Sequence, residues 1–512
     1  MGEYAPAEEG AAFACSRQYY DELEQWLAGE ETTGAQHGEL EEQLEVRGRE
    51  LLRRLFQDRL DLLAAREVRR QDVTGADGVA RTRADTGRQR TLATRFGQVT
   101  VSRIAYRAPG VANLHLVDAA LNLPREKHSH GLRKLAAIEA VRGSHEDAAE
   151  AITRVTGVKI GKRQVEELAL RAAADVDIFC ADRRPGPAPQ DHALVLTFDG
   201  KGIVMRPDAL RPATAKAAAT AQGKLATRLS PGEKRGRKRM AELACVYDAA
   251  PVPRAPQDVI TSPAKTRRNK QKAQDEGKGK RRDPQAAGKW LTASVTSDIP
   301  AVIADAFREA DRRDPQHLRE WVVLVDGNTA QIDAVTAETT RRGLSVTVVI
   351  DFIHVLEYLW QAAWSFFDKG EPAAEDWVAD QARKVLHGKA GQVAAGIRRR
   401  ATTYGYSRAE RAGADTCARY LTTKLPFLDY PKALTQGWPI ATGIIEGACR
   451  HIVKDRMDIT GARWGLAGAE AILKLRALTA SGDFDTYWRY HLRREHERIH
   501  HTKYRDTSIL AA

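Results

Sequence analysis

The chain has 512 residues, 43% of them hydrophobic, and a formal net charge of +12, so it is long enough for several domains and favours a polyanionic partner over a neutral one. No apolar stretch is long enough to span a bilayer and the amino terminus has no apolar signal core, which argues against a membrane protein and predicts a cytoplasmic one. The five cysteines are widely spaced without a CxxC pair, which argues against a zinc finger or a disulfide framework.

Residues 1–85 are predicted to form an arm followed by one amphipathic helix. Residues 1–38 mix polar residues with glycine, and we expect them to be loosely held. From Leu40 onward, leucines and one phenylalanine recur at helical spacing to about Arg69. The apolar stripe suits packing in a core better than pairing with a second protomer.

Residues 86–190 are predicted to form a β-hairpin and a helix-turn-helix-like DNA-binding region. The hairpin alternates about Gly97, and its basic polar face suits either solvent or a phosphate backbone. Ser144 begins a helix that Gly157 ends, and the next helix opens with a basic run. This outline is that of a helix-turn-helix, although any two-helix hairpin looks similar. The residues expected to contact DNA here are Lys159, Lys162, Arg163 and Gln164.

Three apolar runs in the middle of the chain each stop on an aspartate. Near-continuous apolar strands imply a sheet that helices cover on both faces, and the strand ends of such a sheet form a ligand-binding rim. Carboxylates gathered at one rim need a cation such as Mg²⁺ or Mn²⁺, which would suit metal-assisted phosphodiester chemistry. The runs are 194–198 before Asp199, 321–325 before Asp326, and 344–350 before Asp351.

The elements around these runs predict an α/β core over residues 191–354. A strand at 240–247 lies within a Lys/Arg-rich stretch, 201–289, which we otherwise expect to be a basic loop that grips phosphates. Helices at 299–313 and 329–342 then alternate with strands. Antiparallel strands followed by β-α-β-α-β have the order of the ribonuclease H fold, a mixed sheet with helices on both faces. The basic residues of the loop expected to contact DNA are Lys201, Lys234, Arg235, Arg237, Lys238 and Arg239.

The remaining chain is predicted to be an all-helical insertion, 355–440, and a final segment, 441–512, with a core helix and a basic tail. Glu446 on that core helix is the candidate for a third acidic ligand. Arg450 and Lys454 follow on successive turns, so one helix face would offer an acid to the rim and cations to a phosphate.

The basic tail also holds two histidines one helical turn apart. His496 and His500 have the i, i+4 spacing that binds metal in some enzymes. Because no companion glutamate motif accompanies them, we interpret them as part of a solvated helix face.

Five motifs in order carry a resemblance to a known family. Together they resemble bacterial insertion-sequence transposases of the ISKra type, which are related to the Mutator-like DDE transposases. The similarity spans about residues 90–505, and the order of the motifs is more specific than any one of them. The motifs are Phe198–Met205, Val325–Ala330, Asp351–His354, Gly443–Gly447 and Gly461–Trp464.

The resemblance implies a ribonuclease H-like core whose catalytic, metal-binding residues are Asp199, Asp326 and Glu446. The first follows the first strand, the second follows the fourth strand, and the glutamate lies beyond a helical insertion. The family's (Cys/Asp)-x-x-His signature matches Asp351 and His354, which would lie near the site. Each residue alone has an ordinary explanation, as a turn former, a helix cap or a packed histidine.

The last motif has two interpretations. Arg463 and Trp464 could hold DNA by charge and by stacking on a base. A core tryptophan beside a surface arginine explains them equally well.

The expected function is therefore a DDE transposase that cleaves DNA at the ends of an insertion sequence and joins those ends to target DNA. Two Mg²⁺ ions, with Mn²⁺ as a substitute, would activate water or a DNA 3′-hydroxyl and stabilise the leaving oxygen. The partners would be double-stranded DNA, as terminal inverted repeats and target, and a second protomer, because two ends must be held together. The alternatives are a ribonuclease H-fold nuclease without strand transfer, and a DNA-binding regulator or inactive transposase derivative.

Overall fold

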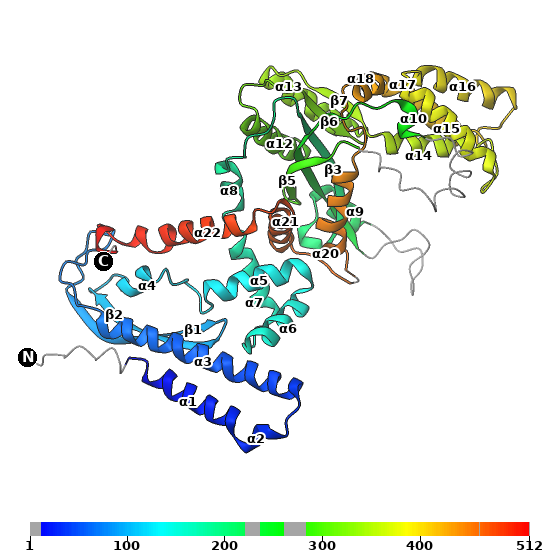
Figure 1. Ribbon diagram of the computed structural model, residues 1–512. Coiled ribbons are helices and arrows are strands. Elements are labelled where there is room, and N and C mark those ends of the chain that lie inside the picture. Colours follow the sequence, from blue (N-terminus) through cyan, green and yellow to red (C-terminus); the bar gives the residue numbers. More distant parts are fainter. Residues whose placement is uncertain (1–11, 221–235, 261–282, 460, 511–512) are drawn as a thin grey trace, which may run out of the picture. The chain divides into compact units, whose positions relative to one another are not determined.

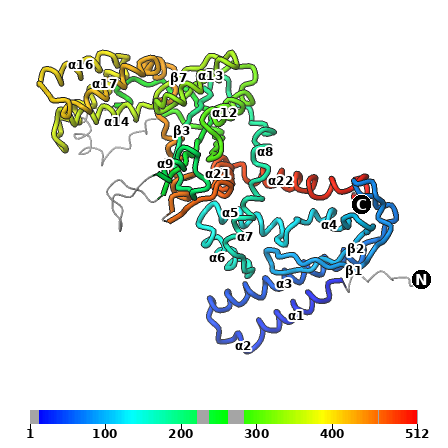
Figure 2. Tube along the Cα trace, turned by 180° about the vertical axis from the view of Figure 1, so that it is seen from behind, coloured from blue at the N-terminus to red at the C-terminus, as the bar shows by residue number. Residues whose placement is uncertain are grey.

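The chain divides into two compact units in the computed structural model (Figures 1 and 2). Unit 1 comprises Met1–Asp182 together with Asp483–Ala512, and unit 2 comprises Arg183–Gly482. The predicted segment 441–512 is divided between the units, since Asp483–Ala512 belongs to unit 1. The structure describes residues 12–220, 236–260, 283–459 and 461–510.

Unit 1 begins with helices where a loose arm was predicted. The helices α1 (Ala14–Ala28) and α2 (Glu30–Thr33) precede the long helix α3 (His37–Arg66), which matches the predicted amphipathic helix. The arm prediction is wrong because α1 packs against α3. The backbone N–H of Ser16 donates to the buried Asp58 carboxylate over 2.9 Å, which ties the two helices together.

The predicted hairpin and the predicted helices of unit 1 are confirmed. Strands β1 (Arg83–Thr94) and β2 (Gly97–Arg107) pair antiparallel, and Gly97 has a φ of 125°, which favours glycine in the turn. Ser144 caps α6 by accepting a hydrogen bond from the Asp147 backbone N–H. The helices that follow the hairpin are α4 (Leu116–Ala120), α5 (His130–Arg142), α6 (His145–Thr156), α7 (Lys162–Ala172) and α8 (Val176–Asp182).

The carboxyl-terminal helix α22 (Phe484–Ile499) completes unit 1. His496 Nε2 lies 2.8 Å from the Ala119 carbonyl oxygen, and His500 Nε2 lies 2.9 Å from the Leu123 carbonyl oxygen. The prediction of a solvated helix face is therefore wrong for both histidines. They bind the segment before α5 to the end of the chain.

Unit 2 is built on a five-stranded mixed sheet with the strand order β5-β4-β3-β6-β7. The first three strands in sequence pair antiparallel, and β6 and β7 then run parallel to β3, as predicted. The strands are β3 (Ala193–Met205), β4 (Arg237–Ala249), β5 (Ala286–Ser294), β6 (Trp321–Val325) and β7 (Thr347–Ile350).

The sequence predicted that the first strand of the core ends at Asp199, but strand β3 continues beyond that residue. It continues to Met205, where it still pairs with Arg237 of β4. The side chains of Ile203 and Met205 are buried, so the alternation that defines a half-buried strand persists beyond Asp199. Lys201 and the basic residues 237–239 consequently lie in strands and not in a loop.

Helices cover the sheet on the side of its main apolar core. Helices α12 (Ile299–Arg313) and α13 (Thr329–Arg342) have the predicted bounds, and Phe307 of α12 is fully buried in that core with Phe198 and Val325 of the sheet. Smaller helices join the early strands: α9 (Pro212–Ala219) and α10 (Pro256–Val259).

The predicted insertion is helical throughout its described elements, and a further helical segment returns to the sheet (Figure 1). Within the described residues, every helix is either too short or too polar to cross a lipid bilayer. The insertion contains α14 (Phe352–Ala363), α15 (Pro372–Leu386), α16 (Ala390–Thr403), α17 (Ala412–Thr423) and α18 (Tyr430–Thr435). The returning segment contains α19 (Gly443–Ala448), the π-helix η3 (Cys449–Lys454), α20 (Asp455–Met457) and α21 (Leu466–Ser481).

Candidate active site

Three aspartates lie level with one another on three neighbouring strands. Strand β3 pairs with β6 through Thr197 and Leu324, and β6 pairs with β7 through Val325 and Ile350, both in parallel register. Extending these pairings by one or two residues places Asp199 beside Asp326 and Asp326 beside Asp351. Neighbouring strands are about 4.8 Å apart, so the register gathers the three carboxylates in one row.

The aspartates face the side of the sheet away from the main core. Phe198 and Val325 point into that core, and successive residues of a strand point to opposite faces. The segment α19–η3 contacts β3, and the Cys449 thiol of η3 interacts with the Asp199 carboxylate. Burial, followed by the charge of Asp199, raises the pKa of Cys449. Helix α19, which carries Glu446, therefore approaches the row of aspartates from this face.

Glu446 meets the row at its Asp351 end. Ligand atoms of Asp351, His354 and Glu446 lie within 4.8 Å of one another, close enough for one metal ion. The Thr442 hydroxyl lies 2.6 Å from Asp351 Oδ2 and 3.1 Å from Glu446 Oε1. His354 Nδ1 lies 3.1 Å from Asp351 Oδ2. Thr442 precedes α19, so it positions that helix against the aspartate.

The charges in this cluster are distributed unevenly. Burial, then the hydrogen bond and charge of Asp351, raises the pKa of Glu446. Burial opposes ionisation of Asp351, but hydrogen bonds from His354 and Thr442 outweigh it and lower its pKa. The hydrogen bond to Asp351 raises the pKa of His354 to about 9, and the charge of Asp326 contributes. Two close carboxylates oppose each other's ionisation, so the pKa of Glu446 is raised while that of Asp351 is lowered.

Asp326 is fixed by the turn after β6 and by the insertion. Its Oδ1 accepts the Asn328 backbone N–H over 2.7 Å, and its carbonyl oxygen accepts the Tyr420 hydroxyl over 3.0 Å. Gly327 has a φ of 92°, and a Cβ there would lie 2.7 Å from the same hydroxyl. The Tyr420 ring stacks on Tyr358 with centroids 3.9 Å apart. The helical insertion therefore supports the position of this carboxylate.

The oxygen-rich donor set fits a hard divalent cation. Asp199 Oδ1 and Asp326 Oδ1 each accept a backbone N–H group, which orients each carboxylate. Glu446 brings a third carboxylate from the facing helix. Carboxylate oxygens suit Mg²⁺ and Mn²⁺, and inclusion of the His354 nitrogen would favour Mn²⁺.

Sequence reasoning missed three side chains of this site. Three residues of the site lie outside the five motifs of the sequence: Tyr420, Thr442 and Cys449. Position 442, directly before the Gly443–Gly447 motif, carried a signal, since a threonine at a helix entry commonly bonds nearby groups. Tyr420 and Cys449 are placed only by tertiary contacts.

The predicted DNA-contacting residues of unit 1 lie at the entrance of α7. Lys159, Lys162 and Arg163 are exposed, and the first two line a groove of about 650 Å³ between α6 and α7. Glu146 and Glu150 also line this groove, so cations and acids alternate there. The side-chain oxygen of Gln164, although exposed, accepts the Gly161 N–H over 3.0 Å and thereby caps the helix.

Some side chains of unit 2 that were predicted to contact DNA are exposed, whereas others form hydrogen bonds within the protein. Arg239 Nε and Nη1 donate to the carbonyl oxygens of Val295 and Ala209, so this arginine holds loops of unit 2 together. Arg237 is half-buried on the same strand. Lys234 and Arg235 lie outside the described residues. The exposed cations predicted to bind DNA are Lys201, Lys238, Arg450, Lys454 and Arg463.

The Trp464 ring is buried and is therefore not accessible to a DNA base. Its exposed fraction is 7%, its indole N–H donates to the Met457 carbonyl oxygen, and its backbone pairs with Val204 and Arg206. The prediction of base stacking is therefore wrong, and the interpretation as a core tryptophan holds. The ring packs on Arg456, whose guanidinium carbon lies 4.7 Å from the ring centroid.

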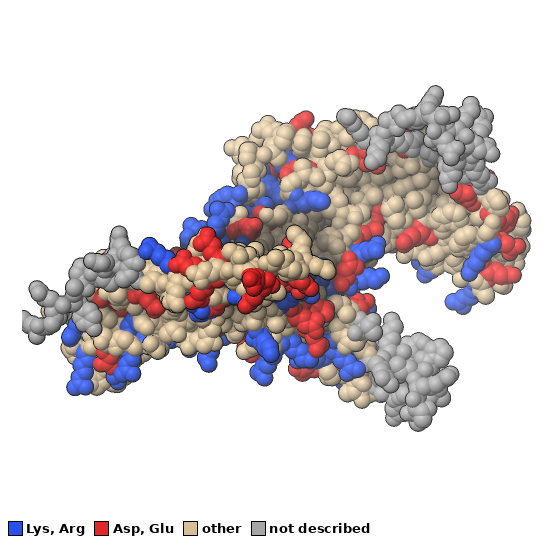
Figure 3. All heavy atoms as spheres, turned by 60° about the horizontal axis from the view of Figure 1, so that its bottom comes forward, with Lys and Arg blue, Asp and Glu red and all other residues tan. Residues whose placement is uncertain are grey.

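The surface does not show one continuous basic face from the side drawn in Figure 3, where Lys and Arg side chains are interspersed with Asp and Glu. The segments 221–235 and 261–282, which the structure does not describe, are rich in Lys and Arg in the sequence. Net charge alone therefore does not locate a polyanion on the described surface.

In comparisons with known proteins, no protein-family model and no curated protein matches the chain.

Proposed function

We propose that this protein is a metal-dependent DNA transposase that cleaves phosphodiester bonds and transfers the new ends to a second DNA. The observation that carries the proposal is the parallel register of β3, β6 and β7, which aligns Asp199, Asp326 and Asp351 in one row. A row of carboxylates on one face is costly without cations, and such a site is suited to binding them. The resemblance of the motifs to DDE transposases points to the same residues.

The strand order supports a ribonuclease H-like core. Three antiparallel strands followed by two parallel ones, in the order β5-β4-β3-β6-β7, are compatible with that fold. The helical insertion between Asp351 and Glu446 agrees with the position that the family resemblance implies. The contacts of α19 with β3 and β4 support Glu446 as the third acid of the proposed site.

In this proposal Asp199, Asp326 and Glu446 hold two Mg²⁺ ions. When bound, the ions would polarise the scissile phosphate and make water, or a DNA 3′-hydroxyl, a better nucleophile at neutral pH. Asp351 and His354 act as positioning residues, since Asp351 bonds the entrance of α19 through Thr442. Tyr420 supports the Asp326 turn from the insertion.

Double-stranded DNA would be the substrate. Unit 1 offers the exposed cations at the entrance of α7, and unit 2 offers Arg450 and Lys454 one and two turns after Glu446. Cations on the helix that carries the acid suit a phosphate lying beside the metal site. We expect a dimer or larger assembly on DNA, because transposition requires two ends held together.

The test is Mg²⁺-dependent cleavage of DNA that carries the sequences flanking the gene, with wild type and Asp326→Asn. We expect wild type to cut at the element ends and the variant to lose at least about 1,000-fold of that rate, because it lacks a metal-binding charge. Both proteins should bind the DNA equally.

A joining assay separates transposition from hydrolysis alone. A pre-cut element end is incubated with a target plasmid, and a transposase joins the two whereas a nuclease of the same fold does not. Full cleavage by Asp326→Asn would disprove the assignment of this carboxylate. Binding without cleavage in wild type would favour a DNA-binding derivative.

A further inference from the structure

Unit 1 contains a second site whose charges the proposed active site does not use. A cavity of about 740 Å³ opens where the chain's carboxyl-terminal segment joins the amino-terminal part of the unit. Its charged lining comes from the segment before α5, the end of α7, and α22 with the residues after it. The charged residues of the lining are Arg125, Glu126, Arg171, Glu495, Arg498 and Lys503.

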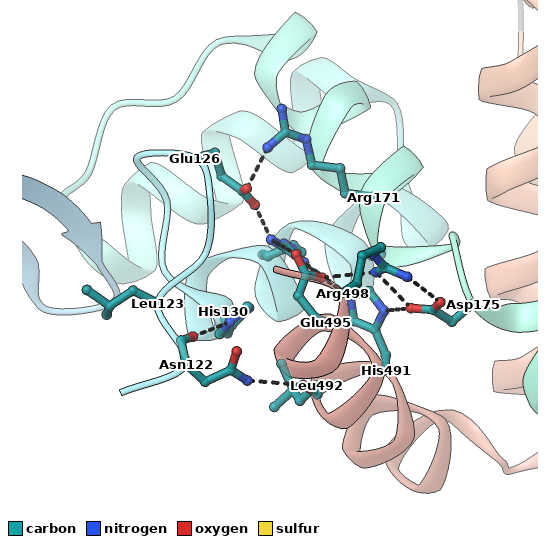
Figure 4. A network of polar contacts seen from close by, with 12 residues as sticks. Asn122, Leu123, Glu126, His130, Arg171, Asp175, His491, Leu492, Glu495 and Arg498 are labelled. Carbon is teal, nitrogen blue, oxygen red and sulfur yellow. Dashed lines mark hydrogen bonds and ion pairs between the residues drawn. The ribbon is translucent and has the colours of Figure 1, made fainter. Parts of the chain in front are cut away.

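The two carboxylates of the cavity lining are already neutralised by ion pairs with arginine side chains. Glu126 and Glu495 both form ion pairs with Arg133, whose side chain is fully buried. Glu126 also pairs with Arg171 over 2.5 Å. Figure 4 shows Glu126 and Arg171 turned toward each other, with Glu495 on α22 nearby. They therefore have little charge left for the other cations of the cavity.

A second set of ion pairs holds Arg498 in the wall of the cavity. Its guanidinium pairs with the buried Asp175 over 2.8 Å, and Asp175 also binds His491 Nδ1 over 2.6 Å (Figure 4). Burial lowers the pKa of His491, but hydrogen bonds to Asp175 and Glu495 raise it overall. The arrangement holds Arg498 in place without balancing the cavity's charge.

Two cations of the cavity have no carboxylate in contact. Among the described residues, neither Arg125 nor Lys503 forms an ion pair, and both side chains are exposed at the mouth of the cavity. Burial, together with the nearby charges of Arg125 and Arg90, lowers the pKa of Lys503, while Asp118 opposes this effect. Like charges held together in a partly desolvated cavity are stabilised by a bound anion.

We propose that this cavity is a phosphate-binding site. Arg125 and Lys503 supply unbalanced charge, and Arg171 and Arg498 supply guanidinium groups that suit phosphate oxygens. The phosphate comes either from a DNA backbone or from a free oligophosphate. The DNA source rests on the proposed function, and it would place a second backbone contact at the far end of α7 from Lys162.

The test uses the full chain and the double variant Arg125→Ala/Lys503→Ala. The matched control, Arg489→Ala/Arg493→Ala, removes the same charge from exposed positions of α22 outside the cavity. Binding of a fluorescent 30-base-pair duplex and of tripolyphosphate is measured by anisotropy and calorimetry without divalent cations. Far-ultraviolet circular dichroism checks that both variants fold, which we expect because neither changed cation of the cavity forms an ion pair.

If the source is DNA, the cavity variant should bind duplex about tenfold more weakly than the control, and the slope of log affinity against log salt should fall by one to two. If the source is a free oligophosphate, only tripolyphosphate binding should be lost. Equal behaviour of the cavity variant and its control in both assays would overturn the proposal. Because no metal is present, this outcome is independent of cleavage, whose failure would overturn the proposed function alone.

Discussion

The two units each contain a cluster of carboxylates around one histidine, and the clusters are built in opposite ways. In unit 1, Glu126, Glu495 and Asp175 are matched by three arginines and His491, and all their contacts are ion pairs. In unit 2, the candidate site contains Asp199, Asp326, Asp351 and Glu446. Among the described residues, the only ion pair that these acids form is the one between Asp351 and His354.

The difference distinguishes a structural network from a candidate catalytic one. Balanced buried charges hold elements together, and removal of one member leaves an uncompensated charge. Unbalanced carboxylates in register contribute little to folding, and they are arranged for a cation that binds later. The same substitution should therefore have opposite consequences in the two clusters.

The largest expected effect is the difference between Glu446→Gln and Glu495→Gln in unfolding free energy and in cleavage rate. Glu446 forms no ion pair among the described residues, and burial and the neighbouring Asp351 raise its pKa. Replacement by glutamine should therefore change the free energy of unfolding by less than about 0.5 kcal/mol while lowering the cleavage rate about 100-fold or more. Glu495→Gln should cost about 3 kcal/mol of unfolding free energy, because it removes a carboxylate that pairs with both Arg133 and His491, whose side chains are fully buried. Urea unfolding and the cleavage assay measure the two quantities. A stability loss at Glu446 equal to that at Glu495 would remove the distinction.

The pH dependence should differ in sign between the clusters. The pKa of His354 is raised to about 9, so its contribution to stability is complete below about pH 6.5 and is lost as the pH rises to 9. His354→Gln should therefore destabilise by about 1–2 kcal/mol at pH 6, after allowance for solvent screening, and by almost nothing at pH 10.

Glu495 behaves in the opposite way. Burial opposes its ionisation, but hydrogen bonds from His491 and Arg133 lower its pKa to about 2. Its contribution is therefore complete above about pH 4.5 and is lost as the pH falls to 2. Thermal melts of each glutamine variant against wild type across this range measure both windows. Parallel pH profiles for the two variants would contradict the charge assignments.

The smallest effect concerns DNA binding by unit 1. Lys162→Ala should weaken duplex binding about threefold and reduce the salt slope by about one, because it removes one exposed cation at the entrance of α7. Lys369→Ala removes an exposed cation from the insertion and serves as the control. Anisotropy titrations at several salt concentrations give both quantities, and identical slopes for the two variants would exclude a phosphate contact at Lys162.

Local signals in the sequence determined much of the fold. The bounds of α12 and α13 follow from their caps and apolar spacing, and Asp326 and Asp351 follow their strands as predicted. The antiparallel start of the sheet and its parallel continuation also follow from the alternation of strands and helices. These features depend on residues within a few positions of one another, which the sequence records directly.

Only the tertiary structure decided which side chains meet. Strand β3 extends past Asp199 because β4 pairs with it, Trp464 is buried because it packs on Arg456, and α22 returns to unit 1 because its histidines bond carbonyl groups of that unit. The contact of Glu446 with Asp351 depends on Thr442, far along the chain from the aspartate. Such contacts arise from residues distant in sequence, so no local spacing or propensity encodes them.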